Sequence, residues 1–569
     1  MSEAPAGTVV GVFLEQAAQR GDAPFLHRWT GSGWEELSWA DCRRRVLRIG
    51  AALAGDGVKR GEAVILLAEN RSEWILADLG IQAAAAVTVP IYATSTPETM
   101  AKIAANCDAK LAIVGSAELA TRLPAGLKVV QVDTDLARWM ESEPLPADRA
   151  ELEHRLAALE PTDVASIIYT SGTTGDPKGV VLPHSNVVEM ARATLRDFTV
   201  GADDSLLSFL PFSHVFERQS GIFIAIIAGA QIWVSRGLDN LAEDIAAVNP
   251  TLMLGVPRMF EKIVDRIRAE ASRQPAWKRA LFGLALAGRL GPLGTLILAP
   301  IRRRVGGTRL RMFVSGGSPL SPDVESFFWA LGIPIFIGWG MTETTSAATA
   351  NTPTEHRLGT VGRALPGVEL KVDSDGELLV RGPGVLREYS RDPVATTESL
   401  VDGWLRTGDI ATIDGEGFVR ITDRKKDLLK TSGGKFVAPQ PIEAALQGTR
   451  CIETAVLIGD NRPYVTALLV PKWEWLRSEL GLEGDPTALV SDERVLEAVR
   501  GCVEQVNARL AHWETVTHFR LLARDFEEAE DLRTPSLKIK RAAIRHRYAD
   551  LIDQMYAETA RRQDAPKQA

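Results

Sequence analysis

Short apolar runs alternate with segments of helical period along the first 340 residues of the chain. Residues 41–53 and 72–84 repeat apolar side chains at helical spacing, whereas 63–67 and 86–92 are short apolar runs typical of buried strands. Strands that alternate with helices predict parallel sheets covered by helices. We therefore expect an α/β fold whose large N-terminal domain is built of layered α/β sheets.

The pattern changes after Gly367, where short alternating strands are separated by tight turns. Residues 368–372 and 377–381 flank Asp-Ser-Asp-Gly, and 409–413 and 417–422 flank Asp-Gly-Glu. Glycine supplies the positive φ that such hairpin turns need. These signals predict a small β-barrel-like subdomain at about 350–423.

A charged segment, Asp-Arg-Lys-Lys-Asp at 423–427, ends this β-rich region and suits a linker. The chain then returns to a mixed pattern typical of α+β structure. We expect an N-terminal domain at 1–423, a hinge at 424–427 and a smaller, mobile α+β domain at 428–569. Its elements are expected as strands near 453–458 and 464–470 and helices near 439–447 and 493–511.

The composition excludes several classes of protein. With 569 residues the chain is too long for one core, and 45% hydrophobic with 24% charged residues is usual for a soluble multidomain protein. A net charge of −8 gives no basic field for nucleic acid. The N-terminus lacks a signal-peptide pattern, and the four cysteines are far apart with no CxxC pair. We therefore expect a cytoplasmic protein with neither a zinc site nor a disulfide framework.

Two apolar stretches bear on membrane contact. Residues 221–234 are too short to span a bilayer and are interpreted as buried core. Residues 281–301 are interrupted by glycines, prolines and Arg289, and Arg302–Arg304 follow. This pattern fits two packed helices. It also suits peripheral contact of residues at about 281–304 with the inner face of an anionic membrane.

The segment from Tyr169 to His184, YTSGTTGDPKGVVLPH, carries the strongest chemical signal. An apolar strand at 164–169 is followed by a loop rich in glycine and hydroxyl groups, and 180–182 predicts another strand, with Ser185 as the cap of a following helix. Glycine N–H groups, hydroxyls and one lysine together make a phosphate-binding loop. The expected ligands are Thr170, Ser171, Gly172, Thr173, Thr174, Gly175 and Lys178. A Walker A loop is disfavoured because the lysine precedes Gly179 and a strand follows. The remaining alternative is a Ser/Gly turn with no binding role.

Residues 170–179 resemble the signature [ST]SG[ST]TGxPKG of the AMP-forming adenylating enzymes, the acyl-CoA synthetase and luciferase-like superfamily. Further motifs of that family follow in its order over nearly the whole chain. The resemblance implies activation of a carboxylic acid with ATP and Mg²⁺ to an acyl-adenylate, followed by transfer to coenzyme A.

Two segments resemble the family's adenine and phosphate motifs. Gly316, Gly317 and Ser318 follow an apolar strand at 310–314, and in the family this segment lies along the adenine. Gly338–Thr344 resembles GYGxTE. The resemblance implies stacking of the adenine on the Trp339 ring, with Gly340 also at the nucleotide, and a hydrogen bond from Thr342 to the α-phosphate. It further implies Mg²⁺ on Glu343, with Thr174 as a weaker ligand.

Three further segments resemble the ribose, hinge and thiol-acceptor motifs. Asp409, in Trp-Leu-Arg-Thr-Gly-Asp, and Arg424 would bind the ribose, although an aspartate in a β-turn is the alternative for the first. Lys426 occupies the hinge position. The resemblance assigns Ser432, Gly433, Gly434 and Lys435 to the loop that serves coenzyme A in the second half-reaction.

Three segments narrow the substrate. Thr534–Arg541, TPSLKIKR, resembles the C-terminal motif of long-chain acyl-CoA synthetases and aligns Lys538 as the catalytic lysine, with Lys540 as the alternative. His214 matches the position beside the substrate carboxylate, and 256–262 also resembles the long-chain subgroup. The sequence predicts a long-chain fatty acid–CoA ligase. Another carboxylic acid, a carrier-protein acceptor and a non-catalytic sensor remain as alternatives, and monomer and homodimer are both open.

Overall fold

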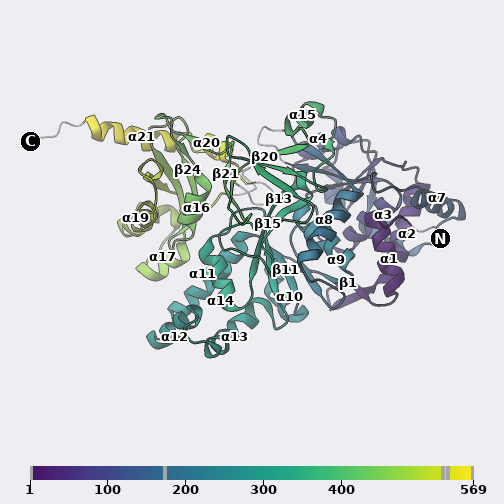
Figure 1. Ribbon diagram of the computed structural model, residues 1–569, viewed down its shortest axis with the longest axis horizontal. Coiled ribbons are helices and arrows are strands. Elements are labelled where there is room, and N and C mark those ends of the chain that lie inside the picture. The colour runs from purple at the N-terminus through teal and green to yellow at the C-terminus, as the bar shows by residue number, and fades with distance from the viewer. Residues whose placement is uncertain (1–3, 171–175, 527–531, 534–538, 565–569) are drawn as a thin grey trace, which may run out of the picture.

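A computed structural model describes residues 4–170, 176–526, 532–533 and 539–564. Most of the chain forms two large sheets with helices around and between them (Figure 1). The first sheet has seven strands in the order β18 (Glu388–Tyr389), β8 (Lys178–Pro183), β7 (Val164–Thr170), β4 (Val87–Ile91), β3 (Ala63–Leu67), β5 (Leu111–Val114) and β6 (Lys128–Gln131). Its β7, β4, β3, β5 and β6 run parallel, which fits the predicted strand–helix alternation.

The second sheet joins the first 40 residues to the middle of the chain. Its nine strands are β15 (Arg363–Ala364), β14 (Ser346–Ala350), β13 (Ile335–Met341), β12 (Met312–Ser315), β11 (Leu252–Gly255), β9 (Ser205–Ser208), β10 (Gln231–Val234), β1 (Pro24–Trp29) and β2 (Trp34–Ser38). Its central strands are parallel, and antiparallel pairs close both edges. The α/β fold class is therefore confirmed.

Helices pack around and between these sheets. They are α1 (Val9–Arg20), α2 (Trp39–Gly55), α3 (Ser72–Ala83), α4 (Pro97–Cys107), α5 (Ala117–Thr121), α6 (Ala137–Glu141), α7 (Pro146–Ala157), α8 (His184–Asp197), α9 (Ile224–Ala228), α10 (Leu241–Val248), α11 (Pro257–Ser272), α12 (Ala276–Leu286), α13 (Pro292–Gly306) and α14 (Pro322–Leu331). Every residue of α3 is buried, since this helix lies inside the main core.

An ion pair inside this core anchors the segment around His214. Arg218 lies in the π-helical turn η2 (Phe216–Phe223) and binds both carboxylate oxygens of Asp78, at 2.8 and 2.7 Å, and the Ser166 hydroxyl at 2.7 Å. A buried charge is tolerated only when it is paired and hydrogen-bonded in this way. The Asp78–Arg218 pair therefore ties α3 to η2, the turn that begins two residues after His214.

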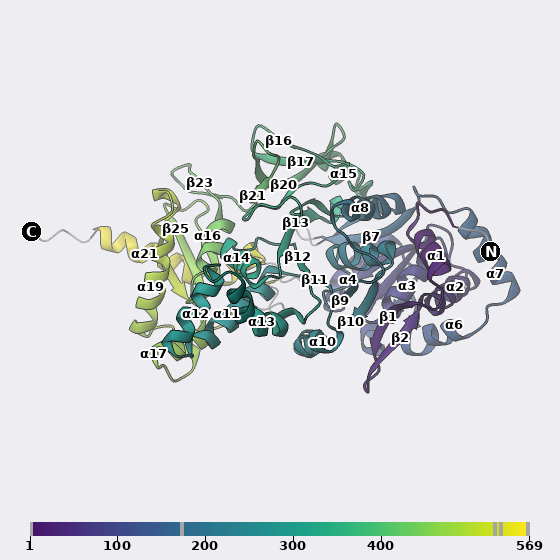
Figure 2. The same ribbon diagram turned by 60° about the horizontal axis from the view of Figure 1, so that its bottom comes forward.

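The predicted hairpins form a small separate sheet. It contains β16 (Glu369–Val372), β17 (Glu377–Arg381), β20 (Trp404–Ile413) and β19 (Leu400–Val401), with β21 (Val419–Arg424) paired to β20, and α15 (Pro393–Ser399) lies beside it. Figure 2 shows this sheet standing over the junction between the large sheets and the C-terminal part of the chain. Strands β14, β15 and β18 belong instead to the two large sheets.

The chain after residue 428 has its own sheet and its own cores. Strands β24 (Ile452–Ile458), β25 (Val465–Pro471) and β26 (Val516–Leu521) form the sheet, and β22 (Leu429–Lys430) pairs with β23 (Phe436–Val437). Its helices are α16 (Pro439–Gln447), α17 (Trp473–Leu480), α18 (Pro486–Leu489), α19 (Glu493–Asn507), α20 (Arg541–Arg547) and α21 (Ala549–Asp564). We call residues 428–564 the C-terminal unit.

Two sequence-based expectations are wrong. Helix α8 begins at His184 and its N-cap residue is Pro183, so Ser185 lies inside the helix and does not cap it. Cys451 and Cys502 form a disulfide, because α19 packs beside the start of β24 and brings together two residues 51 positions apart. Sequence spacing carries no information about that packing. Among the described residues, no helix is long and apolar enough to cross a membrane.

Candidate active site

A cavity of about 2330 Å³ lies where the two large sheets, the small sheet and the C-terminal unit meet. Most of the described residues that the sequence singled out line it. They are Thr170, Lys178, His214, Gly316, Gly317, Ser318, Trp339, Gly340, Thr342, Glu343, Arg424 and Lys426. Ser171, Gly172, Thr173, Thr174, Gly175 and Lys538 lie outside the described residues.

Two glycines let the backbone fold closely at this cavity. Gly317 has a φ of +87°, a left-handed conformation that glycine adopts without strain. Gly340 lies at an irregularity in the β13–β14 pairing, and a Cβ there would be 1.7 Å from the carbonyl oxygen of Ser346. Glycine is therefore required at position 340 for Trp339 and Thr342 to face the same cavity.

Asp409 lies behind the cavity wall. Its carboxylate accepts a hydrogen bond of 2.9 Å from the indole nitrogen of Trp339 and pairs with the Arg424 guanidinium at 2.9 Å. Only 3% of Asp409 is exposed, so it joins the predicted adenine-stacking residue to the predicted ribose-binding arginine. All three residues were predicted to lie at the nucleotide, but the link that the carboxylate makes between the other two has no signal in the sequence.

Glu343 is buried and held by a residue that sequence analysis missed. The Tyr389 hydroxyl donates a 2.9 Å hydrogen bond to its carboxylate, and the Lys178 ammonium lies 5.4 Å from the centre of the Tyr389 ring. Burial, together with the adjacent Glu343 charge, raises the pKa of Tyr389. The only sequence signal was a tyrosine between charged residues, because its partner strand β8 is more than 200 residues away.

The residues around Glu343 fit a magnesium ion. Mg²⁺ prefers hard oxygen ligands and commonly takes one or two carboxylates with the rest of its shell from phosphate and water. Glu343 offers such a carboxylate at the cavity wall. Among the described residues no group of three or more His, Cys, Asp and Glu side chains could hold a metal by itself.

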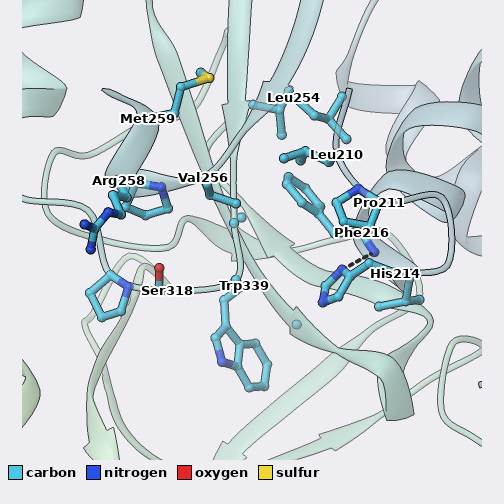
Figure 3. A pocket seen from close by; sticks show the side chains of 18 of the residues that line it. Leu210, Pro211, His214, Phe216, Leu254, Val256, Arg258, Met259, Ser318 and Trp339 are labelled. Atoms are coloured by element: carbon cyan, nitrogen blue, oxygen red, sulfur yellow. Dashed lines mark hydrogen bonds between the residues drawn. The ribbon is translucent and has the colours of Figure 1, made fainter. Parts of the chain in front are cut away.

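The imidazole of His214 lies at the border between polar and apolar parts of the cavity. Its Nδ1 accepts a hydrogen bond of 3.1 Å from the backbone N–H of Phe216, as the dashed line in Figure 3 shows. That bond fixes the orientation of the ring, because Nδ1 is held as an acceptor. The His214 ring centre lies 6.4 Å from that of Tyr92, which also lines the cavity.

An apolar branch extends from this point, and its residues were not assigned from sequence. Leu210, Phe216, Leu254, Val256 and Met259 surround its start in Figure 3. It continues along α11 and towards α10, α12 and α13. The further lining residues are Leu241, Ile245, Ile263, Ile267, Phe282, Ile301 and Val305. The spacing of Met259, Ile263 and Ile267 by four residues is the signal that could have identified one wall.

The C-terminal unit contributes the other polar wall. Lys540 and Arg541 line the cavity, and Arg541 binds both carboxylate oxygens of Glu443, one of them at 2.7 Å. Although burial opposes it, the Glu443 carboxylate raises the pKa of Arg541. By contrast Ser432, Gly433, Gly434 and Lys435 are exposed and do not line the cavity.

Comparison with known proteins agrees with this arrangement. Residues 13–390 match the AMP-binding enzyme family, and 426–560 match the AMP-binding enzyme C-terminal domain. The long-chain-fatty-acid–CoA ligase FadD15 of Mycobacterium bovis is 32% identical, over 96% of this chain and 97% of the relative. The long-chain-fatty-acid–CoA ligase ACSBG2 of Gallus gallus is 28% identical, over 98% and 82%.

Solved structures show the same fold. The anthranilate CoA ligase AuaEII with anthranoyl-AMP matches with a TM-score of 0.74 at 20% identity, covering 96% of this chain and 98% of that one. A Mycobacterium tuberculosis fatty acyl CoA synthetase matches with a TM-score of 0.65 at 21% identity, covering 96% and 99%. The family models match most of the length of this chain, and the cavity lies between its two parts. This chain therefore belongs to the AMP-binding enzyme family.

Proposed function

We propose that this protein is an AMP-forming long-chain fatty acid–CoA ligase. One observation carries the proposal: a single cavity joins the motif residues Trp339, Glu343 and Arg424 to a long apolar branch along α11. Relatives that bear this activity in their names align with nearly the whole chain. The family implies ATP and coenzyme A as co-substrates.

The polar end of the cavity suits adenylation. Trp339 would offer a ring for the adenine, and Arg424, which pairs with Asp409, would face the ribose. Thr342, Lys178 and the loop at 170–175 would bind phosphate oxygens, and Mg²⁺ on Glu343 would supply positive charge for them. The barrier to this reaction comes largely from negative charge that accumulates on the phosphate oxygens in the transition state. Each preorganised donor to those oxygens therefore raises the rate by about 10²–10³-fold.

The reaction has two steps. A carboxylate oxygen of the fatty acid bonds to the α-phosphorus of ATP, and the bond from that phosphorus to the oxygen bridging to the β-phosphate breaks, which releases pyrophosphate. The thiolate of coenzyme A then attacks the acyl carbon, and the bond from that carbon to the AMP oxygen breaks. His214 lies where the carboxylate would pass from the apolar branch to the nucleotide.

Two domains would serve these two steps. We assign 1–423 to the adenylating domain, 424–427 with Lys426 to the hinge, and 428–569 to the mobile domain. Lys538 would reach the nucleotide in the first step, a role supported by its neighbours Ile539 and Lys540 on the cavity wall. Rotation about the hinge would then bring the exposed loop of Ser432, Gly433, Gly434 and Lys435 to the thiol.

The surface of α12 and α13 suits peripheral contact with an anionic membrane. Trp277 and Leu296 are 65% and 71% exposed, with Leu284 and Leu293 also exposed. Residues 276–306, which hold both helices, contain six Lys and Arg and no Asp or Glu, in a chain of net charge −8. Exposed apolar side chains among cations match a surface of anionic lipid, the expected source of the fatty acid.

Pyrophosphate release tests the proposal directly. The protein is incubated with ATP, Mg²⁺ and acids of increasing chain length, with and without coenzyme A. We expect release with long-chain acids and an acyl-CoA product. No release with any acid would contradict the enzyme assignment, and release without acyl-CoA would point to another acceptor such as a carrier protein.

Lys538→Ala should abolish pyrophosphate release but spare thioester formation from supplied acyl-adenylate. If Lys540→Ala does so instead, the motif alignment is wrong by two residues.

A further inference from the structure

Helix α11 separates the apolar branch of the cavity from the C-terminal unit. Met259, Ile263 and Ile267 recur every four residues and therefore lie along one face, which lines the cavity. Arg258 and Asp265, seven residues or two turns apart, both make ion pairs with the C-terminal unit. Figures 1 and 2 both show α11 beside this unit.

The first contact is a branched ion pair at the start of the helix. The Arg258 guanidinium donates to Glu453 in β24 at 3.1 Å and to Asp525, after β26, at 2.5 Å. Burial raises the pKa of Asp525, but the Arg258 and Arg533 charges outweigh it and leave the pKa below its usual range. The Asp525 carboxylate is therefore charged at neutral pH and pairs with arginines from both parts of the molecule.

The second contact lies two turns further along the helix. Lys472, which follows β25, pairs with Asp265 at 2.7 Å and also donates to the carbonyl oxygens of Gln447 and Thr449. Only 16% of the Lys472 side chain is exposed, so this cation is fixed within the C-terminal unit. A fixed, half-buried charge loses less entropy on pairing than a free surface lysine does, so this pair should exceed the usual value of an exposed one.

These ion pairs exist in one particular arrangement of the C-terminal unit. In it Lys540 and Arg541 face the nucleotide end of the cavity, whereas the loop at 432–435 is exposed to solvent. Any rotation that carries that loop to the cavity must separate Lys472 from Asp265 and Arg258 from its two carboxylates. The pairs are thus specific to the arrangement suited to adenylation.

We propose that Arg258 and Asp265 are positioning residues that hold the C-terminal unit in place for acyl-adenylate formation and must release it before thioester formation. The inference rests on the proposed function. It adds that the α11 ion pairs help to set the equilibrium between the arrangement for adenylation and the arrangement for thioester formation. Since the same helix lines the apolar branch, the helix that would contact the acyl chain also carries these ion pairs.

The test measures the two half-reactions separately. Asp265→Lys places two cations together, and we expect ATP–pyrophosphate exchange with palmitate to fall about 10-fold in rate with little change in the KM for ATP. Thioester formation from supplied palmitoyl-adenylate should stay the same or rise. The charge swap Asp265→Lys with Lys472→Glu should restore most of the exchange, which a merely structural role would not do. Glu497→Lys, which reverses one charge of the exposed Glu497–Arg500 pair within α19, should change neither rate.

A second measurement does not depend on activity. Trypsin cleaves after Lys and Arg, and the Lys425 and Lys426 side chains in the hinge are exposed. The backbone N–H groups of Lys425 and Asp427 are hydrogen-bonded to Gly408 and Arg424, so cleavage requires this segment to open. We expect Asp265→Lys to speed cleavage at 424–426 about five-fold and the charge swap to reverse this, since cleavage follows the population of the open form. Unchanged cleavage and unchanged exchange in Asp265→Lys would overturn the proposal. Equal losses in both half-reactions, together with a lower Tm, would show that Asp265 has a packing role instead. If the wild type activates no acid, the proposed function is wrong, and the cleavage rates alone then decide whether the α11 ion pairs hold the C-terminal unit in place.

Discussion

The Tyr389 hydroxyl lies 2.9 Å from a carboxylate oxygen of Glu343 and donates a hydrogen bond to it. Tyr389 belongs to β18, which adds to the edge of the seven-stranded sheet beside β8, whereas Glu343 follows the last parallel strand of the nine-stranded sheet. The bond therefore joins the two sheets at the place where we propose that a magnesium ion and the phosphates would bind. Because the pKa of Tyr389 is raised, its hydroxyl stays protonated and remains a donor.

Replacing Tyr389 with phenylalanine should impair magnesium use in particular. The variant keeps the ring beside Lys178 but removes the hydrogen bond that Tyr389 donates to the Glu343 carboxylate. Loss of such an outer-shell partner costs about 10–100-fold in metal affinity or activity. We expect the Mg²⁺ concentration for half-maximal pyrophosphate exchange to rise by about that factor. Tyr464→Phe, in the C-terminal unit, serves as the control. An unchanged Mg²⁺ dependence in Tyr389→Phe would show that Glu343 is oriented without this bond.

Local patterns predicted the elements of the fold well. The strand at 63–67 and the helix at 439–447 agree with the structure to the residue, because each carries a clear period and clear end signals. The helix expected to continue to 511 ends at Asn507, whose side chain instead bonds the backbone of Val516. That end depends on a contact across a loop, which helical periodicity does not include.

Contacts between distant segments could not be predicted in the same way. Trp339 and Asp409 were each assigned to the nucleotide from their own motifs, yet their mutual hydrogen bond depends on how the small sheet sits on β13. Tyr389 carries no motif strong enough to mark it, and the Cys451–Cys502 pair has no spacing signal. The motif residues were therefore accessible from sequence, and the residues that hold them in place required the fold.

A tryptophan at position 267 should shorten the acyl chains that the enzyme accepts. Ile267 lies two turns beyond Met259 on the cavity face of α11, about 12 Å further along the helix axis. Each methylene that can no longer be buried costs about 0.8 kcal/mol, so exclusion of two or more should lower kcat/KM for palmitate by at least about 10-fold. Laurate should be affected less than about 2-fold, since its shorter chain ends nearer Met259.

The measurement is kcat/KM over a series of saturated acids from eight to eighteen carbons. Val394→Trp adds the same side chain at an exposed position of α15 outside the cavity and should leave the profile unchanged. An equal loss for every acid in Ile267→Trp would mean that the apolar branch does not hold the acyl chain.

The α12–α13 surface should bind vesicles that contain anionic lipid. Burial of the exposed apolar side chains and attraction of the surrounding cations both favour the interface, and each cation near such a surface contributes about 1 kcal/mol. Trp277→Ser with Leu296→Ser should reduce co-sedimentation with phosphatidylglycerol vesicles at least about five-fold, and the wild type should bind neutral vesicles more weakly than anionic ones. Val394→Ser is the matched control on another face. Equal binding of wild type and double variant would exclude this surface as the contact.

Glu217 should make the protein less stable as the pH rises towards 8. This carboxyl is fully buried, accepts a hydrogen bond from Ser208, and has one oxygen without a hydrogen-bond partner in the described part of the chain. Burial raises the pKa of Glu217 to about 8, from the ordinary value of 4.5 that the unfolded chain would have. The native state therefore holds a proton that the unfolded state has released.

The sign of the effect follows from this difference in bound protons. The contribution of Glu217 to the free energy of unfolding is complete below pH 4.5, decreases between pH 4.5 and about 8, and is lost above about 8. Where the native and unfolded states differ by a full proton, the free energy of unfolding falls by about 1.4 kcal/mol per pH unit. Glu217→Gln keeps the shape and hydrogen-bonding capacity but cannot ionise. Melting temperatures measured from pH 6 to 9 should therefore fall more steeply for the wild type than for Glu217→Gln, and the curves should run parallel above about pH 8. Parallel curves across the whole range would show that Glu217 is ionised in the native protein, in which case a cation or ordered water must accompany its second oxygen.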